Sequence, residues 1–181
     1  MPWSAARPAD GAARAEIGII VSRLDFMISR LTAQRALLHE AARLIAGSPG
    51  CVFELGLGSG RTFDHLRAIL PEREIFAFDR GITAHPKCIP DGDHLILGEI
   101  RETLRFCAPR IPGKPALIHI DLGSGDPTQD LITRSWLSPL IAEWTQPGTI
   151  VLADRPVDGA FHELPRPADC PASSHLLLRA V

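Results

Sequence analysis

The feature that most constrains the fold is the alternation of short apolar runs with helical segments after residue 50. The apolar runs occupy residues 51–55, 74–79, 94–97, 116–121 and 149–154, with a further run at 174–180. Segments with helical spacing lie between most of them, at residues 62–70, 100–107 and 129–145. Parallel strands need long crossover connections, which are usually helices. The alternation therefore predicts an α/β fold with a mostly parallel sheet and helices on both faces.

The chain before residue 50 has a different pattern. Residues 1–10 contain two prolines and no periodicity, which predicts a loose arm. Residues 12–46 have apolar side chains at mostly helical spacing and end at a Gly-Ser-Pro-Gly stop. This segment is long for one globular helix, which allows a break near residues 29–32. A length of 181 residues suits a single domain, with N-terminal helices preceding an α/β core at 50–181.

Composition excludes several classes of protein. Nineteen basic and 21 acidic residues give a formal charge of −2, so the basic excess typical of nucleic-acid binding is missing. No apolar run approaches the ~20 residues of a membrane span, and residues 1–20 lack the zones of a secretory signal. The four cysteines are widely spaced, which favours reduced thiols over a disulfide framework. We expect a cytoplasmic protein that binds neither nucleic acid nor membrane.

The chemistry is concentrated in a glycine-rich turn after the first strand. Gly56, Gly58 and Gly60 follow Glu54 and lead directly into a helix, whose N-terminus offers unpaired N–H groups. Asp79 ends the second strand, where a carboxylate can accept hydrogen bonds from a ribose diol. This pattern predicts a nucleoside-containing cofactor at the carboxyl edge of the sheet. Arg61 stands where the dinucleotide fingerprint needs glycine or alanine, which disfavours NAD(P).

The motif resembles the acidic-x-G-x-G-x-G motif of class I S-adenosylmethionine-dependent methyltransferases, which have a Rossmann-like, doubly wound fold. The resemblance implies that Glu54 helps to orient the methionine ammonium group and that the glycine loop lies under the methionine and ribose. It also implies that Asp79 binds the ribose hydroxyls, that Glu99 accepts from the adenine amino group, and that Ile100 packs on the adenine ring. The predicted cofactor-binding residues are Glu54, Gly56, Leu57, Gly58, Ser59, Gly60, Thr62, Asp79, Arg80, Gly98, Glu99, Ile100, Asp121 and Leu122.

The fourth-strand motif, from His119 to Gly123, matches the segment that faces the transferred methyl group in this family. If the acceptor carries a proton, Asp121 is a candidate base, and so is His119. A histidine two residues deeper in a buried strand is, however, more often a hydrogen-bonded core residue. The resemblance implies methyl transfer to an acceptor that we expect to be a small molecule. An NAD(P)-dependent oxidoreductase and a non-catalytic cofactor-binding protein are the alternatives.

Asp121 and Asp154 end neighbouring strands, as the two metal-binding carboxylates do in catechol-type O-methyltransferases. The third ligand of that group is an asparagine after the second aspartate, and this chain has Arg155 there. A fixed cation would repel a metal ion, so we expect no metal.

The family usually adds a helix and an antiparallel hairpin after the fifth strand. Only 27 residues follow Asp154, which predicts an abbreviated C-terminal part. We therefore expect the N-terminal helices to cover the active site or to form a dimer contact, through an apolar stripe that comprises Ile17, Val21, Leu24, Ile28 and Leu31. Arg23, Arg30 and Gln34 share one helical face, which could meet an anionic acceptor, meet the cofactor carboxylate, or face solvent.

Overall fold

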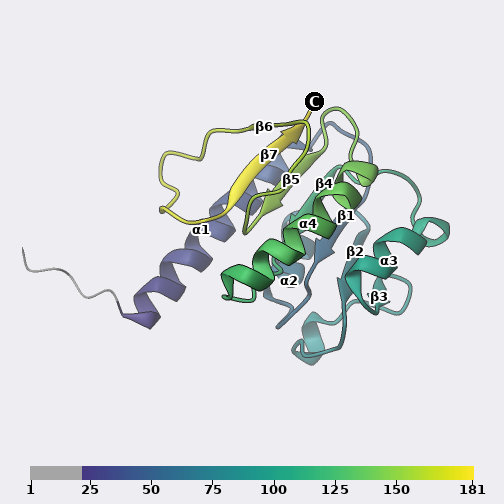
Figure 1. The fold of residues 1–181 in the computed structure, drawn as a ribbon, viewed down its shortest axis with the longest axis horizontal. Coiled ribbons are helices and arrows are strands. Elements are labelled where there is room, and N and C mark those ends of the chain that lie inside the picture. Colours follow the sequence, from purple (N-terminus) through teal and green to yellow (C-terminus); the bar gives the residue numbers. More distant parts are fainter. Residues whose placement is uncertain (1–21) are drawn as a thin grey trace, which may run out of the picture.

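The computed structural model describes residues 22–181 (Figure 1). The predicted loose arm and the start of the predicted helical segment, including Ile17 and Val21, lie outside the described residues. No helix within residues 22–181 has the length and apolar character that a membrane crossing requires.

A seven-stranded sheet forms the centre of the fold, in the order β3-β2-β1-β4-β5-β7-β6. Five strands are parallel: β1 (Val52–Leu55), β2 (Ile75–Asp79), β3 (Leu95–Leu97), β4 (Leu117–Ile120) and β5 (Ile150–Ala153). Strand β7 (Leu176–Ala180) is antiparallel to β5, and β6 (Phe161–Glu163) is antiparallel to β7. The strand order reverses between β1 and β4, and ligands of open α/β sheets bind at such a switch point.

Helices cover both faces of the sheet, as predicted (Figure 1). Helices α1 (Arg23–Leu44) and α2 (Arg61–Ile69) pack on one face, where Leu37, Leu38 and Leu66 meet Val52 and Leu117. Helices α3 (Ile100–Phe106) and α4 (Pro127–Trp144) pack on the other face. Two short 3-10 helices, η1 (Pro86–Cys88) and η2 (Ala108–Arg110), lie in the connections. Because side chains alternate along a strand, Glu54 and His119 point toward the α1 and α2 side.

Helix α1 is continuous, so the break allowed near residues 29–32 is absent. Ser22 and Asp25 form a capping box at its start, which fixes the first turn. One face of its C-terminal half is buried, whereas Leu24 and Ile28 are 68% and 56% exposed. These two residues therefore do not bury against the sheet of this chain. Figure 1 shows the reason: the first turns of α1 extend beyond the rest of the fold.

The C-terminal part is abbreviated in a specific way. The antiparallel strands β6 and β7 are kept, but no helix lies between β5 and β6 in the described chain. The loop from β6 to β7 is held by Arg166, whose guanidinium donates to the carbonyl groups of Pro171, Ser173 and His175. The sequence does not predict strand β6, because a half-buried phenylalanine followed by two exposed polar residues is too short to form a strand pattern.

Candidate cofactor and acceptor site

The glycine loop between β1 and α2 adopts a shape that side chains would prevent. Gly56 has φ of 95°, and a Cβ atom there would collide with the carbonyl oxygen of Asp121. Gly58 has φ of 49° and faces open space, since nothing lies within 4 Å of an added Cβ. The backbone is therefore bare where a ligand would lie against it, which fits the cradle expected for a cofactor.

Asp79 lies at the end of β2, beside this loop. Its carboxylate accepts hydrogen bonds from the backbone N–H of Gly58 at 2.8 Å and of Gly81 at 3.2 Å. A carboxylate has about four lone-pair sites, so two acceptor positions remain for a ribose diol. The predicted position of Asp79 is confirmed, and its contact with ribose remains a prediction.

Below the loop, Glu54 and His119 form a buried pair. The two residues are register partners on β1 and β4, and both side chains are 0% exposed. His119 Nδ1 lies 2.6 Å from Glu54 Oε2, and the hydroxyl of Thr62 donates to Oε1. Burial alone would lower the pKa of His119, but the neighbouring Glu54 carboxylate raises it above the usual value. Glu54 is thus a satisfied core carboxylate in this structure.

Helix α1 reaches the end of β4 through two side chains. Arg30 Nη2 donates to Asp121 Oδ1 at 2.6 Å, and the amide nitrogen of Gln34 donates to Oδ2 at 3.1 Å. The same amide nitrogen lies 3.2 Å from His119 Nε2. Burial would raise the pKa of Asp121, but the Arg30 guanidinium and the Gln34 hydrogen bond lower it overall. Of the predicted row of Arg23, Arg30 and Gln34, the last two therefore meet Asp121, whereas Arg23 is exposed.

The two side chains predicted to hold adenine, Glu99 and Ile100, lie in different environments. Glu99 is exposed at the start of α3, with a carboxylate oxygen 4.0 Å from a guanidinium nitrogen of Arg80. Ile100 is only 7% exposed and packs in the core beneath α3. Leu57 is also buried, so it offers a ligand its backbone. Contacts of these residues with adenine or methionine stay predictions.

Two hollows meet at the carboxyl edge of the sheet. A small one of about 130 Å³ lies between α1 and the glycine loop. A cleft of about 720 Å³ lies between the first turns of α1, the loop after β4, the end of β5 and residues 172–174. Arg30 lines both hollows, and its partner Asp121 lines the smaller one. The Arg30–Asp121 ion pair therefore stands at the junction.

Arg155 occupies the other wall of the cleft. Its guanidinium pairs with Asp154 at 2.8 Å and with Asp130 at 2.6 Å. Gly123 lies against this group, since a Cβ there would come within 2.7 Å of both Asp154 and Arg155. Within residues 22–181, no group of three His, Cys, Asp or Glu side chains is arranged to hold a metal ion. Asp121 and Asp154, the two potential ligands, are each paired with an arginine.

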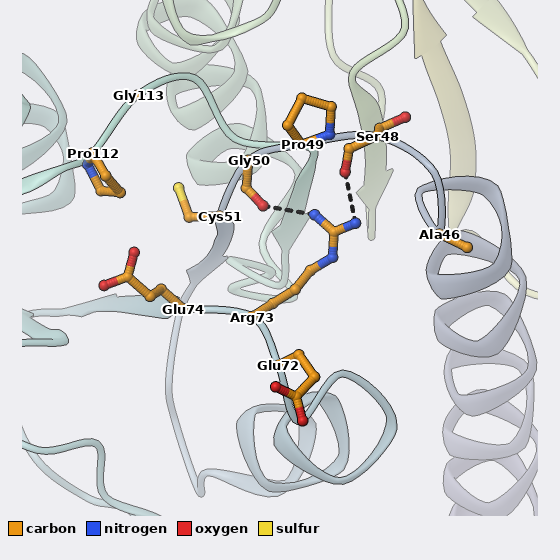
Figure 2. Close-up of a pocket in the computed structure, with 10 residues that line it drawn as sticks. All are labelled: Ala46, Ser48, Pro49, Gly50, Cys51, Glu72, Arg73, Glu74, Pro112 and Gly113. Carbon is orange, nitrogen blue, oxygen red and sulfur yellow. Dashed lines mark hydrogen bonds between the residues drawn. The ribbon is translucent and has the colours of Figure 1, made fainter.

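A third hollow, of about 580 Å³, lies at the opposite edge of the sheet (Figure 2). Arg73 spans it and donates to the carbonyl groups of Gly50 and Ser48, each at 2.7 Å. These contacts tie the end of α1 to the start of β2. Ligands of parallel sheets bind at the carboxyl ends of the strands, and this hollow lies at the other ends. We therefore assign the contacts of Arg73 a structural role.

Some lining residues of the cleft carried no signal in the sequence. Phe26 and Met27 on α1, and Ser173 and Ser174 before β7, line it. Neither set forms a motif, and the segment before β7 comes near α1 only because β7 inserts between β5 and β6. The folded chain alone brings these residues together.

The strand order, the bare glycine loop after β1 and the acid ending β2 together define a class I methyltransferase. Residues 21–180 match the model of the S-adenosyl-L-methionine methyltransferase family, and the chain belongs to this family. It is therefore an enzyme that uses S-adenosylmethionine, which decides against the oxidoreductase and non-catalytic alternatives. No curated protein matches the chain.

Solved structures agree with this assignment. An S-adenosyl-L-methionine methyl transferase from Silicibacter pomeroyi is 38% identical, with a TM-score of 0.80 over 87% of this chain and 98% of that one. Human methyltransferase-like protein 13 in complex with SAH is 12% identical, with a TM-score of 0.50 over 82% of this chain and 81% of that one. DesVI from Streptomyces venezuelae is 17% identical, with a TM-score of 0.50 over 80% and 62%. The last two likenesses show the fold alone.

Proposed function

We propose that the protein transfers the methyl group of S-adenosylmethionine to a small molecule bound in the cleft beside α1. The observation that carries this proposal is the junction at Arg30 and Asp121, where the cofactor hollow opens next to the cleft. A volume of about 720 Å³ lies within the range of small-molecule sites. The cleft walls combine apolar side chains, Phe26 and Met27, with serine hydroxyl groups and arginines.

The bound cofactor supplies an electrophilic methyl group on a sulfonium sulfur. The chain mainly has to align the acceptor with that methyl group and to exclude water. In the proposed arrangement, Asp79 holds the ribose and the bare backbone at Gly58 lets the cofactor lie close to β1. The acceptor approaches from the cleft along the ends of β4 and β5.

Of the two candidate bases, Asp121 is more accessible than His119. The Asp121 side chain is 24% exposed, whereas that of His119 is 0% exposed. Because Arg30 and Gln34 lower the pKa of Asp121, it is a weak base near neutral pH. Asp121 is therefore no strong general base, and a proton would pass to it only from an acidic acceptor.

Two measurements test the proposal. By calorimetry, S-adenosylhomocysteine should bind with roughly micromolar affinity, or about 8 kcal/mol, and NAD should give no heat. A turnover assay then follows S-adenosylhomocysteine formation across small molecules, with a tRNA and a protein mixture as competing acceptors. Turnover with a small molecule supports the proposal, and turnover with only a macromolecule refutes the cleft as a small-molecule site.

We also propose a homo-oligomer that forms through α1, in the cytoplasm. The exposed residues Leu24 and Ile28 lie one turn apart, and this spacing suits a helix contact with a second copy. Light scattering should show a dimer that Leu24→Asp converts to monomer, and a monomeric native protein would refute it. The free thiols of Cys51 and Cys107 are consistent with a reducing compartment.

A further inference from the structure

We propose that the ion pair between Arg30 and Asp121 holds the amino-acid end of the cofactor, and that Glu54, the acid of the glycine motif, does not contact it. This inference rests on the proposed function, since it concerns the same site. It differs from the role that the sequence motif implied for Glu54. Three properties of these side chains support it: which of them line the small hollow, which are exposed, and which match the ligand in charge.

The first property is the lining of the small hollow beside the glycine loop. Its charged lining residues are Arg30, Arg61 and Asp121, and Glu54 is not among the lining residues. A volume of about 130 Å³ is below the usual 300–1,000 Å³ of a site for a whole ligand. The hollow therefore accommodates one end of the cofactor, while the nucleoside extends toward Asp79 along the open edge of the sheet.

The second property is how far each side chain is exposed to a ligand. Both oxygens of Glu54 already accept hydrogen bonds, from His119 and Thr62, and the side chain is 0% exposed. Arg30 and Asp121 are 25% and 24% exposed. Arg30 uses one of its five N–H groups to bond Asp121, and Asp121 accepts two hydrogen bonds with about four lone-pair sites. Glu54 and Asp121 each accept two hydrogen bonds, so exposure is what distinguishes them: Arg30 and Asp121 have open surface, and Glu54 has none.

The third property is the match in charge between these side chains and the ligand. An α-amino acid group carries an ammonium and a carboxylate on one carbon, so its charges lie side by side. Arg30 and Asp121 present the opposite charges side by side, 2.6 Å apart. The guanidinium can donate to the carboxylate with the geometry of a fork, and the Asp121 carboxylate can accept from the ammonium. Both groups are ionised near neutral pH, since Arg30 is an arginine and the pKa of Asp121 is lowered.

The arrangement has a consequence for α1. Arg30 lies on α1 and also lines the acceptor cleft. Helix α1 forms one wall of the cleft, and a cofactor bound to Arg30 would fasten this helix over the glycine loop. Binding of the cofactor and completion of the acceptor site would thus depend on the same side chain.

The experiment compares two ligands by calorimetry. S-adenosylhomocysteine has the amino-acid group, and 5′-methylthioadenosine has the same nucleoside without it. Arg30→Gln should weaken S-adenosylhomocysteine about 10- to 100-fold and change 5′-methylthioadenosine less than about 2-fold, because only the first ligand loses a charged partner. Arg35→Gln, at an exposed position of the same helix that lines neither hollow, is the matched control and should change neither affinity.

Other outcomes overturn the inference. Equal weakening of both ligands by Arg30→Gln would show a general loss of structure. Arg30→Lys, which keeps the charge, is then the test. If it does not selectively restore binding of S-adenosylhomocysteine, the inference fails. Selective loss in Arg61→Gln with no effect in Arg30→Gln would assign the carboxylate to Arg61. Failure of the native protein to bind either ligand would instead refute the cofactor site itself.

Discussion

Replacing His119 with leucine tests whether the Glu54–His119 pair holds the site together. In the native protein, His119 Nδ1 lies 2.6 Å from Glu54 Oε2, and both side chains are 0% exposed. Leucine removes this contact and leaves a buried carboxylate with only the Thr62 hydroxyl as a partner. Removing one member of a buried ion pair typically costs about 3–5 kcal/mol, because the remaining charge is unpaired. We expect a loss of that size in the free energy of unfolding.

Urea unfolding, followed by far-UV circular dichroism, measures this loss. For a protein of 181 residues, 3–5 kcal/mol corresponds to a decrease in Tm of roughly 10 °C. The matched control is His162→Leu on the edge strand β6, where the side chain is exposed. An exposed substitution should change stability by less than about 0.5 kcal/mol.

A double-mutant cycle separates the pair from simple loss of packing. Glu54→Gln keeps the shape of the side chain but removes its charge. In Glu54→Gln/His119→Leu no charge is stranded, so the double variant should lose about 1–3 kcal/mol less than the sum of the single losses. Losses that add within about 0.5 kcal/mol would refute the pair, since they would mean that each side chain acts alone.

Three further outcomes are expected. Burial lowers the pKa of His175 to about 4, below the value of about 6.5 for an unfolded histidine. The free energy of unfolding should therefore fall by up to roughly 3 kcal/mol as the pH drops from 6.5 to 4. Urea unfolding at pH 7 and 4.5 should show this fall, and His175→Gln should reduce it. Asp79→Ala should weaken S-adenosylhomocysteine by about 1–3 kcal/mol in calorimetry, and an unchanged affinity would remove Asp79 from the site. EDTA should leave turnover unchanged because Arg155 occupies the metal-ligand position, so loss of activity with EDTA and recovery with magnesium would contradict this reading.

The sheet could be predicted well because its strands are buried on both faces. The five parallel strands lie within one or two residues of the predicted runs, since glycine and proline residues mark their ends. The glycine loop and Asp79 could be found because their function depends on local backbone geometry. Strand β6 could not, because only its pairing with β7 makes it a strand.

The sequence predicts the position of Glu54 in the fold, but it does not predict which residue Glu54 contacts. The motif places an acid before the glycine loop, and the structure pairs that acid with a histidine 65 residues away. The pairing depends on β1 lying next to β4 in register, which places Glu54 opposite His119. Sequence spacing indicates neither the neighbour nor the register. A buried partner on an adjacent strand can thus turn a ligand-binding acid into a structural one.

The direct connection from β5 to β6 explains why α1 contributes so much to the site. With no helix between β5 and β6 in the described chain, the cleft has only the loop at residues 172–174 as its C-terminal wall. Helix α1 supplies the facing wall and sends Arg30 and Gln34 to Asp121. The buried side chains of its C-terminal half hold the helix on the sheet, and the contacts with Asp121 add a polar attachment near the site. Its first turns bury little, since Leu24 is 68% exposed. Acceptor specificity in this chain should therefore follow the side chains of α1 more closely than those of the C-terminal strands.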